Sequence, residues 1–162
     1  SAGFIHIANH ALIKGGIFMA IGGFVAALGA RASLETITGI GRRMPITATA
    51  FLICGLSLAG LPLTAGFISK LYLVRAILET NSYVILALVL ISSALSVVYL
   101  WKVMEVMWMQ PAPARSPKLV ENPAIYLPLW MVALGNIWFG IDAGWIVGAA
   151  RLAATALLGG GA

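Results

Sequence analysis

The chain has 162 residues, of which 61% are apolar and only 9% are charged, and its mean hydropathy is +1.01. A water-soluble globular domain does not sustain this composition, so we predict an integral membrane protein with a single membrane domain over residues 1–162. The formal net charge is +5, but most of the excess falls in two short loops, which indicates membrane topology rather than nucleic-acid binding. Cys54 is the single cysteine, so neither a disulfide nor a thiolate metal site is predicted.

The first predicted membrane span covers residues 3–28, which exceeds the roughly 20 apolar residues that a crossing needs. Within it, His6, His10 and Lys14 follow one another at four-residue spacing. Residues four positions apart in a helix are separated by about 6 Å along its axis and rotated by about 40° around it. The three side chains therefore form a ladder roughly 12 Å long. A charged residue costs on the order of 2.5 to 3.5 kcal/mol at the bilayer centre, so the ladder predicts a proton or ion path. The alternative is that these side chains only satisfy backbone carbonyls or bridge to a neighbouring helix.

The second crossing is predicted to be a helix in two pieces. A single straight helix over residues 45–80 would be about 54 Å long, which is too much for a hydrocarbon layer of about 30 Å. We therefore expect helices at residues 45–60 and 66–80, with a break between them. Two separate spans are the alternative, but each would have only about 15 or 16 residues.

The predicted break contains Gly60, Pro62 and Gly66. Proline lacks a backbone donor and clashes with the preceding turn, and glycine permits non-helical dihedrals. Broken membrane helices expose backbone groups that only protein or water can satisfy. Lys70 lies one turn beyond the break, where it can meet water near the middle of the bilayer, so it is a second candidate for proton transfer. The alternative is a lysine that snorkels to the membrane surface.

Two further spans are predicted at residues 83–109 and 123–141, with a proline-rich loop between them. The tail at residues 143–158 is short and has Arg151 at its centre, so it fits a helix at the membrane interface better than a fifth span. The predicted fold is therefore all-α and transmembrane. It has about four crossings, one of them discontinuous, and a short C-terminal interfacial helix.

The distribution of basic residues predicts an orientation. With four crossings, the loops after the first and third spans share one side of the membrane. That side holds Arg31, Arg42, Arg43, Arg115 and Lys118, whereas the other side holds Arg75 and Arg151. The positive-inside rule places the more basic side in the cytoplasm, so we expect the C-terminus outside.

Two other polar pairs carry weaker signals. Lys102 and Glu105 lie three residues apart near the end of the third span, where a solvated ion pair and a relay role are equally compatible with the spacing. His6 and His10 have the spacing of a zinc-protease helix, but Ile7 stands where that motif has its catalytic glutamate. We therefore predict no metal site.

Three strings resemble the antiporter-like membrane subunits of respiratory complex I and of Mrp-type cation/proton antiporters. They are NHALIKGGIF at residues 9–18, GIGRRMP at residues 39–45 and LSLAGLPLTAGFISK at residues 56–70. Within that superfamily the chain is most similar to the D-type subunit of the Mrp antiporter, partly through its lysine at the broken helix. The resemblance covers nearly all of the chain but only about the last third of such a subunit. The chain also begins without a methionine, inside a predicted membrane helix, so we expect part of a longer protein.

The resemblance implies roles for individual residues. His10 and Lys14 match the histidine and lysine of the central hydrophilic axis, and His6 is a further member of that helix. Lys70 matches the ionisable residue of the second broken helix, which mediates proton entry or exit. The first inverted repeat of such subunits, with its own glutamate and lysine, is absent, so these residues alone do not assemble a complete path.

The implied function is that of a proton-translocating subunit of a multisubunit Na⁺ or K⁺/proton antiporter, which is a transporter rather than an enzyme. We expect it in a bacterial-type inner membrane, with other membrane subunits as partners and without a cofactor. The alternative is an antiporter-like proton-pumping subunit of an NADH:quinone oxidoreductase, where the redox chemistry occurs in partner proteins. A third possibility is a fragment that supports assembly without transport.

Overall fold

A computed structural model describes residues 2–113 and 118–142, together with Gly144, Gly148, Leu152 and Ala156. These residues form helices and loops, with no strand among them. The elements are α1 (Ala2–Leu28), α2 (Ile40–Arg43), α3 (Pro45–Ala59), α4 (Ala65–Glu79), α5 (Tyr83–Met104), the π-helical segment η1 (Glu105–Met109) and α6 (Pro123–Ile141). The predicted all-α fold is confirmed. The interfacial helix expected at residues 143–158 lies outside the continuously described ranges.

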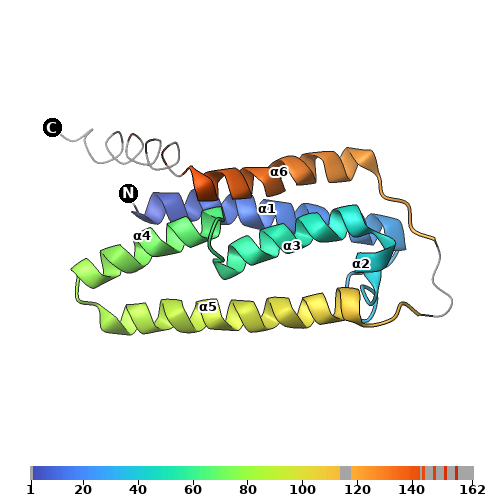
Figure 1. The fold of residues 1–162 in the computed structure, drawn as a ribbon, viewed down its shortest axis with the longest axis horizontal. Coiled ribbons are helices and arrows are strands. Elements are labelled where there is room, and N and C mark those ends of the chain that lie inside the picture. Colours follow the sequence, from blue (N-terminus) through green and yellow to red (C-terminus); the bar gives the residue numbers. More distant parts are fainter. Residues whose placement is uncertain are drawn as a thin grey trace.

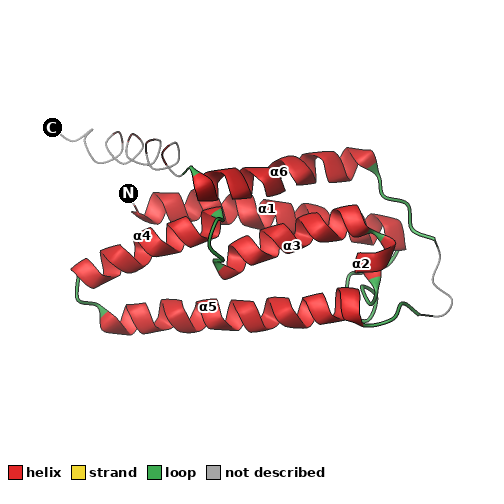
Figure 2. Cartoon of the chain, viewed as in Figure 1, coloured by secondary structure: helices red, strands yellow, loops and turns green. Residues whose placement is uncertain are grey.

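The long helices lie side by side, and successive passes along the bundle, namely α1, α3 with α4, α5 and α6, run in opposite directions (Figures 1 and 2). Helices α3 and α4 follow each other along the long axis of the bundle and together match the length of one neighbour (Figure 1). Helices α1, α3, α4 and α6 pack on one another, whereas α5 runs along one side, against α3 and α4. A hollow of about 710 Å³ with largely apolar walls lies between α5 and helices α1 and α3.

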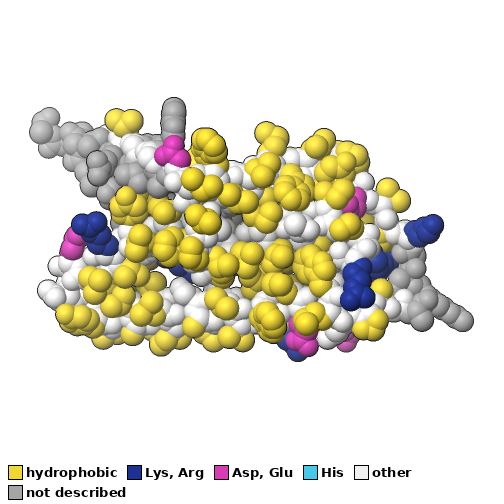
Figure 3. All heavy atoms as spheres, viewed as in Figure 1, with side chains coloured by type: hydrophobic (Ala, Val, Ile, Leu, Met, Phe, Trp, Pro, Cys, Tyr) yellow, Lys and Arg dark blue, Asp and Glu magenta, His cyan; other side chains and the backbone are white. Residues whose placement is uncertain are grey.

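Three segments are long and apolar enough to cross a membrane, namely Ile5–Leu28, Tyr83–Met109 and Pro123–Ile141. Helices α3 and α4 have 15 residues each, and each is therefore only about 22 Å long. Neither spans the hydrocarbon layer alone, so together they form one discontinuous crossing in addition to the three continuous ones. Hydrophobic side chains cover most of the face shown in Figure 3, and most of the Lys and Arg side chains visible there lie toward its two ends. The chain is a multi-pass membrane protein.

Helix starts are set by proline and by polar caps. Helix α3 begins at Pro45, whose missing N–H would have no partner in the first helical turn. The amide of Thr47 in that turn donates to Oε1 of Glu121 at 2.9 Å, which places a carboxylate at the positive end of the helix. Helix α6 begins at Pro123, and the side chain of Asn122 accepts from the amide of Ala124 at 3.0 Å.

The core lies where α1, α3 and α6 meet. One cluster of buried side chains joins Ala20 of α1 to Cys54 of α3 and Leu129 of α6. A β-carbon added at Gly16 would lie 2.5 Å from Sγ of Cys54, so the glycine lets α1 and α3 approach closely. Cys54 is fully buried and serves as a small apolar residue in this contact.

Candidate functional site

Residues 60–64 form the non-helical segment between α3 and α4. Gly60 and Leu63 have φ values of 88° and 70°, both in the left-handed region that glycine adopts without steric cost. The amide of Gly60 donates to the carbonyl of Ser57 at 3.1 Å, which closes the end of α3. A β-carbon on Gly66 would collide with the same carbonyl group. The break predicted around Gly60, Pro62 and Gly66 is therefore present, and the glycines explain its tight geometry.

The side chain of Lys70 reaches back across this break to the end of α3. Its Nζ donates to the carbonyl oxygens of Leu58 and Ala59, both at 2.9 Å. The last carbonyls of a helix have no partners within the helix, and a cation at this end also interacts favourably with the helix dipole. The ammonium group of Lys70 thus completes α3 instead of snorkelling away from the break.

His6 and His10 of α1 lie next to Lys70. Their ring centroids are 5.6 Å apart with 29° between the ring planes, so the imidazoles stack. Nδ1 of His6 lies 3.3 Å from Oγ of Ser69 on α4. A cavity of about 10 Å³ is lined by both imidazoles, Lys70, Ser57 and Ser69. This is about the space that one water molecule requires, and the polar walls supply it with hydrogen-bond partners.

A second cavity, of about 290 Å³, opens on the side that faces α5. Its polar lining residues are His6, His10, Lys70, Ser92, Ser93 and Ser96. The hydroxyl of Ser93 donates to Val89 of its own helix, and that of Ser96 donates to Ser92, so their oxygens remain able to accept from water. The volume is large enough for several water molecules.

The other residues singled out in the sequence lie outside this pair of cavities. Lys14 is exposed on the surface of the described chain and lines neither cavity. Lys102 and Glu105 form an ion pair of 3.9 Å whose side chains are 60% and 39% exposed. The structure therefore brings His6, His10 and Lys70 together and places Lys14 and the Lys102–Glu105 pair apart from them.

Two buried asparagines were not among the candidate site residues. Nδ2 of Asn9 on α1 donates to the carbonyl of Ala65, the first residue of α4, at 2.9 Å. Asn136 on α6 accepts a hydrogen bond from Ser57 at 3.2 Å. Both asparagines are almost completely buried. Their signal in the sequence is an amide within an apolar helix, where a polar group needs a specific partner.

These features define a class of protein: a multi-pass membrane protein in which a discontinuous helix holds a lysine beside two histidines of a neighbouring helix. The family model described as "NADH:quinone oxidoreductase/Mrp antiporter, TM" matches residues 1–96, which is more than half of the chain. The chain belongs to this family of antiporter-like membrane subunits. The superfamily inferred from the sequence motifs is thereby confirmed.

The curated relatives carry the names of respiratory oxidoreductase subunits. NADH-quinone oxidoreductase subunit N of Desulforudis audaxviator is 36% identical over 150 residues, which cover 85% of this chain and 30% of the relative. Subunit N 1 of Solibacter usitatus is 30% identical over 148 residues, which cover 91% of this chain and 30% of the relative. The chain thus spans about 30% of the length of these two relatives.

Solved structures show the same fold in two multisubunit membrane complexes. A chain of the Mrp complex from a Dietzia species matches with a TM-score of 0.83 and 20% identity, over 95% of this chain and 37% of that chain. A chain of the membrane-bound sulfane sulfur reductase, an archaeal respiratory membrane complex, matches with a TM-score of 0.77 and 34% identity. The match covers 86% of this chain and 28% of that chain. At 20% identity, the Mrp match shows the fold alone.

Proposed function

We propose that the chain is part of a proton-translocating subunit of an NADH-quinone oxidoreductase-type respiratory complex. In this proposal Lys70 takes up and releases protons, and His6 and His10 relay them. The observation that carries the proposal is the position of the Lys70 ammonium group, which is bound at the helix break and borders the same cavities as both imidazoles. The names of the curated relatives favour the respiratory branch over the Mrp branch that the sequence motifs favoured.

The geometry supports a sequence of proton transfers. Protonated Lys70 donates to the carbonyls at the end of α3, and the 10 Å³ cavity beside it has room for one water molecule that could receive its proton. The water passes a proton to an imidazole, which accepts at one ring nitrogen and releases at the other. Lys14 lies one helical turn after His10 on α1 and is exposed. It then extends the path from the imidazoles to the surface of the described chain. The remainder of the path belongs to the rest of the subunit.

The proposal includes partners and an orientation. The partners are other membrane subunits of the respiratory complex, in a bacterial-type inner membrane. The loops that carry Arg31, Arg42 and Lys118 face the cytoplasm by the positive-inside rule. The end of α6 then faces the opposite side, and with it the C-terminus.

The proposal is tested with Lys70→Ala in the complete complex, reconstituted in vesicles with a pH-sensitive dye inside. Proton translocation is measured per quinone reduced, so that a lower redox rate does not imitate a transport defect. We expect the ratio to fall, because an alanine carries no proton. Arg75→Ala on the same helix is the control, because the Arg75 side chain is 79% exposed in an ion pair with Glu79. An undiminished ratio for Lys70→Ala would defeat the assigned role.

A second candidate is a subunit of an Mrp-type antiporter, which the motif at residues 56–70 favours and which the description of the matching family model also includes. This candidate predicts that an imposed Na⁺ or K⁺ gradient drives proton movement in vesicles without any quinone reaction. An assembly fragment is the third candidate. It predicts that Lys70→Ala and Lys14→Ala both leave transport intact, while deletion of the chain lowers the amounts of the partner subunits.

A further inference from the structure

We propose that Asn136 of α6 is a positioning residue that holds the two halves of the broken helix together and so keeps Lys70 within reach of its carbonyl partners. This inference rests on the proposed role of Lys70. Asn136 itself does not border either cavity that Lys70 lines. It acts through Ser57, and three sets of contacts link it to the break.

The first set lies at the start of α4, which is capped from another helix. Thr64 occupies the N-cap position, but its hydroxyl donates to the carbonyl of Leu61 and caps no amide of α4. The amide of Gly66 instead donates to Oγ of Ser57 on α3 at 3.2 Å. A residue near the end of α3 therefore supplies the acceptor that the first turn of α4 needs.

The second set fixes the direction of the Ser57 hydroxyl. Its single proton is donated to Oδ1 of Asn136 at 3.2 Å, which leaves the oxygen lone pairs for the amide of Gly66. Nδ2 of Asn136 donates to the carbonyl of Val132 at 3.1 Å and so fixes the orientation of the amide group. Ser57 and Asn136 are both 0% exposed, so bulk water does not reach either of them to replace a lost partner.

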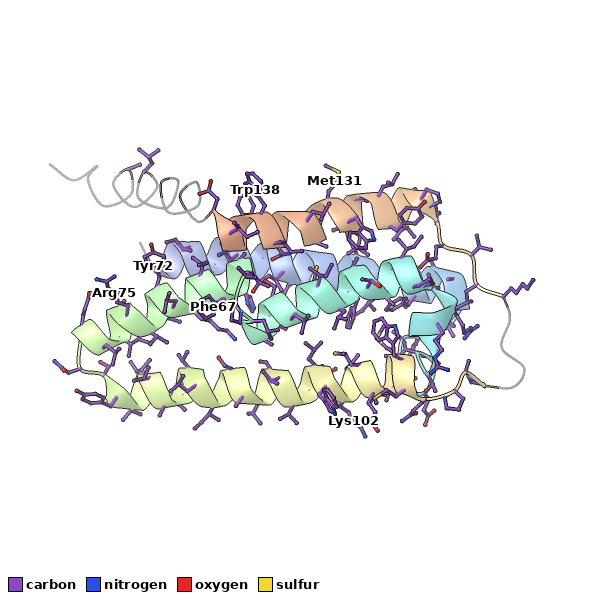
Figure 4. All side chains as sticks on the ribbon, in the orientation of Figure 1. Phe67, Tyr72, Arg75, Lys102, Met131 and Trp138 are labelled. Carbon is purple, nitrogen blue, oxygen red and sulfur yellow. The ribbon has the colours of Figure 1, made fainter. Side chains whose placement is uncertain are left out.

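The third set is the close contact of α6 with the break. Gly140 lies one turn beyond Asn136, and a β-carbon there would collide with the backbone of Leu63 and Thr64. Trp138 lies between Asn136 and Gly140 in the sequence, is 62% exposed and points away from the bundle (Figure 4). One face of α6 therefore meets the end of α3 with the amide of Asn136 and the break with Gly140, and Trp138 lies on the other face.

The link to Lys70 is geometric. Lys70 lies one turn after Gly66, and its acceptors Leu58 and Ala59 follow Ser57 directly. A displacement of the start of α4 relative to the end of α3 moves the donor and the acceptors of these bonds apart. Loss of the Asn136 acceptor frees the Ser57 hydroxyl to rotate and weakens the bond that opposes this displacement.

The test is hydrogen exchange and proton translocation by the complete complex with Asn136→Ala. We expect amide exchange at the break to accelerate about tenfold, as for the loss of one buried hydrogen bond, and proton translocation per quinone to fall. In a Lys70→Ala background, Asn136→Ala should cause no further loss of translocation. Trp130→Phe is the matched control, because it removes a 3.1 Å hydrogen bond from α6 to Ile46 near the other end of α3. It should leave exchange at the break and translocation unchanged.

Ser57→Ala removes the same hydrogen bond from the α3 side and serves as the second variant if Asn136→Ala does not assemble. Amides at the break should exchange no faster in the double variant Ser57→Ala/Asn136→Ala than in Ser57→Ala alone. Wild-type exchange at the break in Asn136→Ala would overturn the inference. Normal translocation by Asn136→Ala, together with defective translocation by Lys70→Ala, would also overturn the inference. That result would leave the proposed function of Lys70 intact. Normal translocation by Lys70→Ala defeats the proposed function instead, and the exchange rates still decide whether Asn136 holds the break.

Discussion

Nζ of Lys70 donates a 2.9 Å hydrogen bond to the carbonyl oxygen of Leu58, which lies on the other side of the helix break. The residue proposed to carry protons is thus also the residue that completes the end of α3. Because both roles depend on the same ammonium group, loss of Lys70 affects the structure as well as proton transfer.

Lys70→Met should lower the stability of the complex by about 1 to 3 kcal/mol, because it leaves the carbonyls of Leu58 and Ala59 without their donor. Thermal denaturation of the purified complex in detergent measures the difference. Arg75→Met is the matched control, since an exposed ion pair contributes less than about 1 kcal/mol. Equal midpoints for the two variants would show that the bonds at the break contribute nothing to stability.

Gly66→Ala should disrupt the break, whereas Gly22→Ala should be tolerated. A β-carbon at Gly66 collides with the backbone of Ser57, which has no flexible end that can move aside, whereas a β-carbon at Gly22 meets nothing within 4 Å. We expect a cost of roughly 3 kcal/mol at Gly66 and unchanged or slightly higher stability at Gly22. The amount of assembled complex and its denaturation midpoint check both. A stable Gly66→Ala complex would contradict the close approach of α3 and α4.

The helices and the break follow from local sequence, since about 20 apolar residues span a bilayer and proline with glycine interrupts a helix. The contact between Ser57 and Asn136 does not, because the two residues are 79 positions apart and only the packing of α6 brings them together. The separation of Lys14 from His6 has a geometric reason. Each step of four residues rotates a side chain by about 40° around the helix, so Lys14 lies about 80° from His6.

His10→Phe should preserve assembly and lower proton translocation by roughly tenfold or more. Phenylalanine keeps an aromatic ring of similar size against His6 but has no nitrogen that accepts a proton. Translocation per quinone in reconstituted vesicles measures the effect. Ile7→Ala on the same helix is the control, because Ile7 is exposed and borders neither cavity. Normal translocation by His10→Phe would remove this imidazole from the path.

Replacement of both Lys102 and Glu105 by alanine should change stability by less than about 1 kcal/mol and leave translocation unchanged. The two side chains form an exposed ion pair and lie apart from the cavities around Lys70. Denaturation and the same vesicle assay provide the two measurements. A clear fall in translocation would favour the relay role that the sequence left open for this pair.

The most direct measurement is proton translocation by the Lys70→Arg complex. Arginine presents N–H donors to the carbonyls at the end of α3 but does not give up its proton in proteins. If Lys70 carries protons, Lys70→Arg assembles with higher stability than Lys70→Met and still fails to translocate. Translocation at the wild-type level by Lys70→Arg would show that position 70 only supports the helix break.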